Sequence, residues 1–198
     1  MPREFDPDAI YHLTARGSNK RDIVVTDLDR TIWVELVAAQ AVARGWIVYA
    51  YCLMTNHYHL VVLAPANDIS PAMQRINCEF SRRVNALHDE SAHRFKNRFE
   101  AKRVRNDAHL LQVVRYVDLN PVRAGMEAFP ENHRWSSYRG LIGLDPAPPF
   151  LSVDETLLLF GNDRQRGRDS YREYVHEVLG RAVANPWAEE AQRKLALV

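Results

Sequence analysis

The order of hydrophobic and polar positions along the chain predicts strands that alternate with helices. Residues 10–16, 46–52 and 57–64 are short runs rich in β-branched and aromatic side chains, which is typical of strands. A turn at residues 54–56 joins the last two runs, so these should form a hairpin. Residues 95–105 alternate apolar and charged positions, which predicts a fourth strand.

Between the first two strands, apolar residues recur at the spacing of a helix. We expect this helix to begin with Asp27 as its N-cap, because a carboxylate can accept the free amide hydrogens of the first turn. Its apolar face is expected to carry Leu28, Ile32 and Leu36. Gly45 follows a basic last turn and should end the helix as its C-cap.

Two further helices are expected in the middle of the chain. One begins at Ser70-Pro71, a cap residue followed by proline at the first helical position. The other is capped by Asp107, and Pro121 either ends it or starts a new turn. Their apolar stripes are Met73, Ile76, Phe80, Val84 and Leu87 in the first and Leu110, Val113, Val114 and Val117 in the second.

This succession of elements predicts an α+β fold, in which helices cover an antiparallel sheet. The pattern weakens after about residue 125, and three prolines follow at Pro146, Pro148 and Pro149. We therefore predict a main domain at residues 1–145 and a helical extension at residues 146–198. The extension is expected to hold short helices near residues 152–161 and 168–180.

The composition favours a globular protein of the cytoplasm. The chain has 198 residues, of which 46% are hydrophobic, enough for one core with an appendage. It contains no run of about 18 apolar residues, so no membrane partner is expected. Its charged start is unlike a secretion signal. Cys52 and Cys78 lie in apolar segments and are interpreted as buried, reduced thiols.

The net charge of +1 conceals an uneven distribution. Residues 71–125 contain 11 Lys and Arg against 6 Asp and Glu, whereas residues 1–70 contain 6 against 8 and residues 126–198 contain 9 against 11. The densest part runs from Arg94 to Arg105. Such a stripe favours a nucleic-acid backbone as partner, and the alternative is a solvated basic loop or edge strand.

His57 and His59 are candidate metal ligands. Side chains two apart on a strand point to the same face, and their Cα atoms lie about 6.5–7 Å apart at a rise of roughly 3.3 Å per residue. Two imidazoles at that spacing can converge on one divalent ion. The alternative is that two histidines share a sheet face by chance.

Tyr116 is a candidate nucleophile. It lies at the border of the apolar stripe of its helix, from where its hydroxyl can face a site on the sheet. Asn120 stacks on the same side one turn later. The alternative is an interfacial tyrosine with a buried ring and a solvated hydroxyl.

Five segments together resemble the REP-associated tyrosine transposases, which are single-tyrosine HUH transposases of the insertion-sequence type. The histidine–hydrophobe–histidine (HUH) motif is matched by His57-Tyr58-His59, and the tyrosine motif by the segment around Tyr116. The resemblance spans about residues 8–140. The matching segments are residues 11–17, 56–62, 94–99, 115–125 and 135–138.

The resemblance implies a ferredoxin-like core that cleaves and rejoins single-stranded DNA. Tyr116 would attack the scissile phosphate and form a covalent 5′-phosphotyrosine, while His57 and His59 would hold Mg²⁺ or Mn²⁺ to polarise that phosphate. Asn120 matches the family's third metal ligand. Because Asn120 precedes Pro121, its side chain is expected either to bind the metal or to cap the helix.

The implied partner is single-stranded or hairpin DNA from repetitive palindromic elements of a bacterial nucleoid, bound by a monomer or a homodimer. Trp135 and Tyr138 would either stack on unpaired bases or pack on the core. Two other functions remain open: a catalytically silent, nucleic-acid-binding regulator derived from such a transposase, and a phosphoesterase that uses water. The residues expected to bind DNA phosphates are Arg16, Lys96, Arg98, Lys102, Arg103, Arg105 and Arg123.

Overall fold

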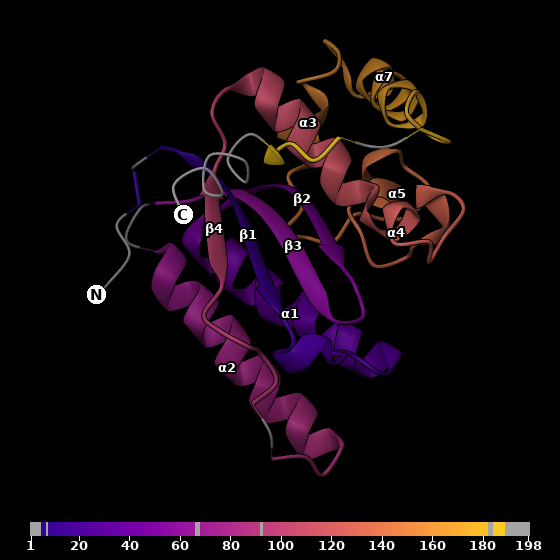
Figure 1. Ribbon diagram of the computed structural model, residues 1–198. Helices are drawn as coiled ribbons and strands as arrows, with labels where there is room; N and C mark the ends of the chain where they lie inside the picture. The colour runs from indigo at the N-terminus through magenta and orange to yellow at the C-terminus, as the bar shows by residue number, and fades with distance from the viewer. Residues whose placement is uncertain (1–4, 7, 66–67, 92, 182–183, 189–198) are drawn as a thin grey trace.

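The computed structural model describes residues 5–6, 8–65, 68–91, 93–181 and 184–188. Its centre is one antiparallel sheet in the order β2-β3-β1-β4 (Figure 1). This order, with one helix after β1 and another after β3, is the ferredoxin-like arrangement, and it confirms the predicted α+β class. The strands are β1 (Ile10–Arg16), β2 (Ile47–Leu53), β3 (His57–Leu63) and β4 (Glu100–Arg103).

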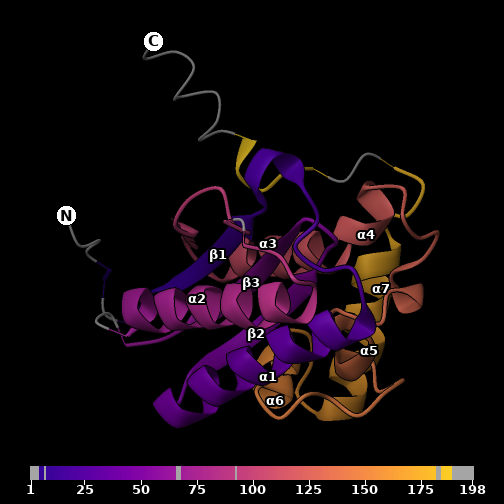
Figure 2. The same cartoon turned by 90° about the horizontal axis from the view of Figure 1, so that it is seen from below.

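Helices cover both faces of this sheet. Helices α1 (Asp27–Arg44) and α2 (Ile69–Leu87) lie side by side on one face, and α3 (Asp107–Asp118) lies on the other (Figure 2). Strand β3 shows the division, because consecutive side chains point to opposite faces. Tyr58 packs on Trp33 of α1, whereas His59 meets Tyr116 of α3.

The predicted helix ends required small corrections. The N-caps are Thr26 and Asn106, whose side chains accept hydrogen bonds from the third backbone amide of α1 and α3. Asp27 and Asp107, the predicted caps, are the first helical residues instead, where a carboxylate still favours the positive end of the helix dipole. Helix α2 starts at Ile69, before the predicted Ser70. Gly45 ends α1 in the left-handed conformation, with φ of 64°, as predicted.

Several predictions of burial were wrong. Leu28 is 54% exposed, because α1 turns Trp33 and Val37 toward the sheet. Leu87 is exposed at the end of α2, and Cys78 is exposed although Cys52 is buried. Of the strand expected at residues 95–105, only β4 forms. Its first part is irregular, apart from one bridge between Phe95 and Gly17.

The remaining helices are short except for one near the C-terminus. Pro121 begins a new turn, α4 (Asn120–Arg123). The two helices expected after residue 150 correspond to α6 (Val153–Leu157) and α7 (Arg164–His176). The segment that leads into α6 attaches to the edge of the sheet, where Ser152 donates its backbone N–H to the carbonyl of Val48. Helix α7 packs on α3, where Tyr171 donates a hydrogen bond to Asp118. The boundary at residue 145 stays a prediction. The remaining short elements are η1 (Ser18–Lys20), η2 (Pro130–Asn132) and α5 (Tyr138–Leu141).

No helix among the described residues combines the length and the apolar composition that crossing a membrane requires.

Candidate active site

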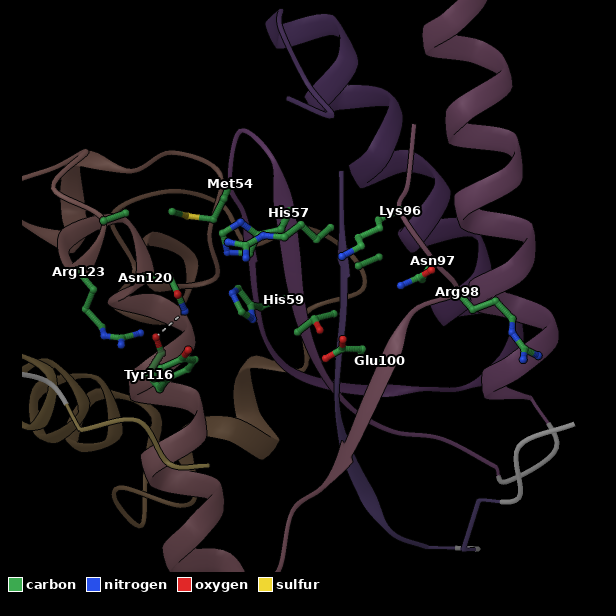
Figure 3. A pocket seen from close by; sticks show the side chains of 14 residues that line it. Met54, His57, His59, Lys96, Asn97, Arg98, Glu100, Tyr116, Asn120 and Arg123 are labelled. Carbon is green, nitrogen blue, oxygen red and sulfur yellow. Dashed lines mark hydrogen bonds between the residues drawn. The ribbon is translucent and has the colours of Figure 1, made fainter. Parts of the chain in front are cut away.

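A cavity of about 590 Å³ opens on the face of the sheet that α3 covers. The strands contribute its floor, α3 and α4 one wall, and the basic segment before β4 the opposite wall (Figure 3). The cavity brings together the three residues on which the sequence prediction rested. Its lining residues include His57, His59, Lys96, Tyr116, Asn120 and Arg123.

In both histidines of β3, Nδ1 lies within hydrogen-bond distance of a neighbouring side chain. His57 Nδ1 lies 2.6 Å from Asn56 Oδ1, and His59 Nδ1 lies 2.8 Å from Nε2 of His12. Nε2 of His59 is buried and has no hydrogen-bond partner among the described residues. An unpartnered buried nitrogen is costly unless a ligand satisfies it. The ring centroids are 4.9 Å apart, so the pair fits a shared metal ion.

Burial keeps these imidazoles neutral at neutral pH. The pKa of His57 is lowered to about 4 by burial and by the nearby Arg16. The pKa of His59 lies well below its usual value, because of burial and then the neighbouring His12 and His57. A metal ligand must be the neutral imidazole, so no proton has to be removed for binding at pH 7.

Tyr116 lies opposite these histidines. Its ring centroid is 6.0 Å from that of His59, and the rings are perpendicular. The guanidinium carbon of Arg123 lies 4.4 Å from the centre of the Tyr116 ring, a cation–π contact that orients both side chains. The ring is half-buried, so the tyrosine is held by packing and still lines the cavity.

Asn120 has the capping role that was one of its two predicted roles. Its Nδ2 donates to the backbone carbonyl of Tyr116 at 2.8 Å and so stabilises the end of α3. Because Asn120 also lines the cavity, its Oδ1 stays a candidate oxygen ligand. Among the described residues no group of three His, Cys, Asp or Glu can hold a metal.

The expected DNA-binding residues divide into two groups. Four of them line the cavity, although Arg98 directs its side chain away from the histidines (Figure 3). The other three lie outside it: Lys102 packs over the ring of Trp187, Arg103 pairs with Asp6, and the backbone N–H of Arg105 donates to His109. The four that line the cavity are Arg16, Lys96, Arg98 and Arg123.

Three further polar residues of this region were not predicted as functional from the sequence. His12 and Asn56 hold the rings of the two metal-ligand candidates, and Glu100 brings a carboxylate to the cavity. Glu100 pairs with Thr14 across the sheet, and Thr14 pairs with His59. Strand alternation alone would have placed His12 on the same face as Thr14, but only the sheet order shows that it meets His59.

The two aromatic residues that were candidates for base stacking differ in burial. Tyr138 is fully buried, so it packs in the core and cannot stack on a base. Trp135 is half-buried, and Arg134 lies over its ring, so stacking on a base stays a prediction for this residue.

Comparison with known proteins agrees with this fold. Residues 7–120, more than half of the chain, match the family described as "Transposase IS200 like". No curated protein matches the chain. A solved structure, described as the REP-associated tyrosine transposase bound to a REP hairpin, is similar to it with a TM-score of 0.63 at 18% identity. The match covers 75% of this chain and 88% of that one. The chain thus belongs to the IS200-like transposase family.

Proposed function

We propose that this protein is a DNA transposase that cleaves and rejoins single-stranded DNA with Tyr116 as nucleophile and a divalent metal on His57 and His59. The observation that carries the proposal is the unpartnered Nε2 of His59, buried at the floor of the cavity that Tyr116 also lines. A metal ion bound at this nitrogen would satisfy a polar atom that is otherwise costly to leave buried, and it would stand beside the tyrosine that is the candidate nucleophile.

In the proposed reaction, the Tyr116 hydroxyl oxygen attacks the scissile phosphorus. The new O–P bond replaces the bond from phosphorus to the 3′ oxygen of the neighbouring nucleotide. The phenol proton is lost and one proton is gained by the leaving 3′-OH, so the products are a 5′-phosphotyrosine and a free 3′-OH. Because the ester conserves the bond, a second 3′-OH can reverse the step on another strand without ATP.

The residues around Tyr116 would prepare this step. Arg123 stacks on the tyrosine ring and places a positive charge beside it, which favours an anionic phosphate and the developing phenolate. His57, His59 and the Oδ1 of Asn120 would hold Mg²⁺ or Mn²⁺. When bound, such an ion supplies Lewis-acid polarisation of the phosphate.

Single-stranded or hairpin DNA is the substrate best suited to this cavity. Arg16 and Lys96 approach it from the sheet and from the wall opposite α3, so phosphates on both sides of the scissile bond would meet cations. The solved relative's hairpin complex, together with the family membership, supports a hairpin carrying a single-stranded flank as the substrate.

The test is covalent trapping. The protein is incubated with Mn²⁺ and hairpin DNA that carries a 3′ fluorophore and a single-stranded flank, and then separated on a denaturing gel. A labelled band at the mass of protein plus DNA is expected, and Tyr116→Phe should abolish it while the unfolding midpoint is preserved. Tyr174→Phe, which alters another half-buried tyrosine outside the cavity, is the matched control and should leave the band unchanged.

Two results would contradict the proposal. Cleavage without an adduct would indicate that water is the nucleophile and favour a phosphoesterase. Binding of the hairpin without cleavage, in Mg²⁺ and in Mn²⁺, would favour a regulator that has retained only the fold.

A further inference from the structure

His12 lies directly behind the proposed metal site. It is 3% exposed, on the strand next to β3, and its Nε2 is 2.8 Å from Nδ1 of His59. The two rings are nearly parallel, with an interplanar angle of 16°. One of these nitrogens must carry the hydrogen that lies between them, because two lone pairs at this distance would repel each other.

The direction of this hydrogen bond determines what His59 can bind. If His12 donates from Nε2, then the neutral His59 carries its own proton on Nε2 and has no lone pair for a ligand there. If His59 donates from Nδ1, its Nε2 keeps a lone pair for a ligand, and His12 carries its proton on Nδ1, a buried nitrogen that also has no hydrogen-bond partner among the described residues. Metal binding therefore requires the second arrangement, in which His12 is the acceptor.

The C-terminal segment holds His12 in place. The ring of Trp187 lies parallel to that of His12, with centroids 5.7 Å apart and an interplanar angle of 13°. Trp187 is 3% exposed and is packed against His109, and the carbonyl of the preceding Pro186 lies 3.1 Å from Nε2 of His109. A residue 175 positions later in the chain thus forms the wall behind His12.

We propose that His12 is a positioning residue that fixes the ring and the tautomer of His59 for metal binding, and that Trp187 keeps His12 in that position. This inference rests on the proposed function, because it requires His59 to be a ligand. The inference also gives the C-terminal segment a role. Metal affinity would depend on Trp187, which lies far outside residues 7–120, the part that matches the transposase family.

The proposal is tested by measuring the Mn²⁺ affinity of the full-length protein without DNA. The electron paramagnetic resonance signal of free Mn²⁺ reports how much of the ion is unbound. His12→Phe keeps a ring against Trp187 but removes the acceptor, and we expect it to weaken Mn²⁺ binding by roughly 10- to 100-fold. His12→Gln offers a carbonyl oxygen at a similar reach and should recover most of that loss. Trp187→Ala should produce a smaller loss, and hairpin affinity in EDTA should be the same for wild type and the two His12 variants.

A second readout uses the unmodified sequence. In ¹⁵N-histidine-labelled wild-type protein with Zn²⁺ as a diamagnetic probe, the imidazole nitrogen shifts should identify His59 as protonated on Nδ1. Protonation on Nε2 in the metal-bound protein would overturn the proposal, as would equal Mn²⁺ affinity of His12→Phe and wild type. If the wild-type protein bound no Mn²⁺ at all, the metal site of the proposed function would itself be wrong, a result distinct from failure of His12 alone.

Discussion

The carboxylate of Asp118 links the helix that carries Tyr116 to the C-terminal helices. It is fully buried at the end of α3 and accepts hydrogen bonds from the hydroxyls of Ser137, at 2.6 Å, and Tyr171 of α7. Burial raises the pKa of Asp118 to about 7, while the two hydroxyl donors act in the opposite direction. We predict that Tyr171→Phe destabilises the protein in a manner that depends on pH.

The direction of this pH dependence follows from the ionisation of Asp118. Its folded pKa exceeds the unfolded value of about 3.9, so between pH 4 and 7 the folded state holds a proton that the unfolded chain has released. Its contribution to stability therefore falls as pH rises through this window. Losing the Tyr171 hydroxyl raises the folded pKa further. A hydrogen bond to a neutral acceptor contributes about 0.5–1.5 kcal/mol to stability, and one to a charged acceptor about 1.5–3 kcal/mol. Tyr171→Phe should therefore lower the free energy of unfolding more at pH 8.5 than at pH 5.5.

Urea unfolding at the two pH values, followed by circular dichroism, measures the free energy of unfolding of wild type and variant. The matched control is Tyr174→Phe on the same helix, whose half-buried ring packs on Arg115 and Phe160 and should cost less than about 0.5 kcal/mol at either pH. An equal cost of Tyr171→Phe at pH 5.5 and pH 8.5 would refute the idea that Asp118 ionises next to this hydroxyl.

Three further predictions concern the cavity and its surroundings. The imidazole of metal-free His57 should titrate near pH 4 in an NMR titration, because burial and Arg16 lower its pKa. The unfolded chain then binds this proton at higher pH than the folded protein, so the free energy of unfolding should fall as pH drops below about 6.5. A titration midpoint above pH 6 would contradict this prediction. Arg16→Gln and Lys96→Gln should each reduce the slope of log binding constant against log salt concentration for the hairpin by about one phosphate contact. The control Arg166→Gln, on the exposed face of α7, should leave this slope unchanged. The same slope for all three variants and wild type would exclude the cavity as the DNA site. Gly17→Ala should destabilise the protein by about 1–3 kcal/mol in thermal unfolding, because its Cβ would lie 2.1 Å from the carbonyl oxygen of Arg21, and an unchanged midpoint would be inconsistent with this packing.

Local patterns were sufficient to predict most of the sheet. The runs that became β1, β2 and β3 are rich in β-branched and aromatic residues, and a period of two placed His57 and His59 on one face. The errors at the starts of α1 and α3 have a common cause, since Thr26 beside Asp27 and Asn106 beside Asp107 offer two adjacent residues that are both able to cap.

What could not be predicted depends on contacts between distant parts of the chain. The partner of His59 is 47 positions away, and it is identified only when β1 is known to lie beside β3. The stacking of Trp187 on His12 has no local signal, because it joins residues that are 175 positions apart in the chain. The β4 prediction was too long because its ladder with β1 covers only four residue pairs, and alternation in sequence does not reveal where pairing stops.

Peptide mapping of the protein–DNA adduct identifies the residue that attacks the phosphate. After nuclease trimming and trypsin digestion, cleavage following Arg115 and Arg123 releases the peptide of residues 116–123, which contains a single tyrosine. Mass spectrometry should find this peptide, or its form with a missed cleavage, carrying a 5′-linked nucleotide on Tyr116. A nucleotide attached to any other residue, or efficient cleavage of the hairpin with this peptide unmodified throughout the reaction, would contradict the assignment of Tyr116 as the nucleophile.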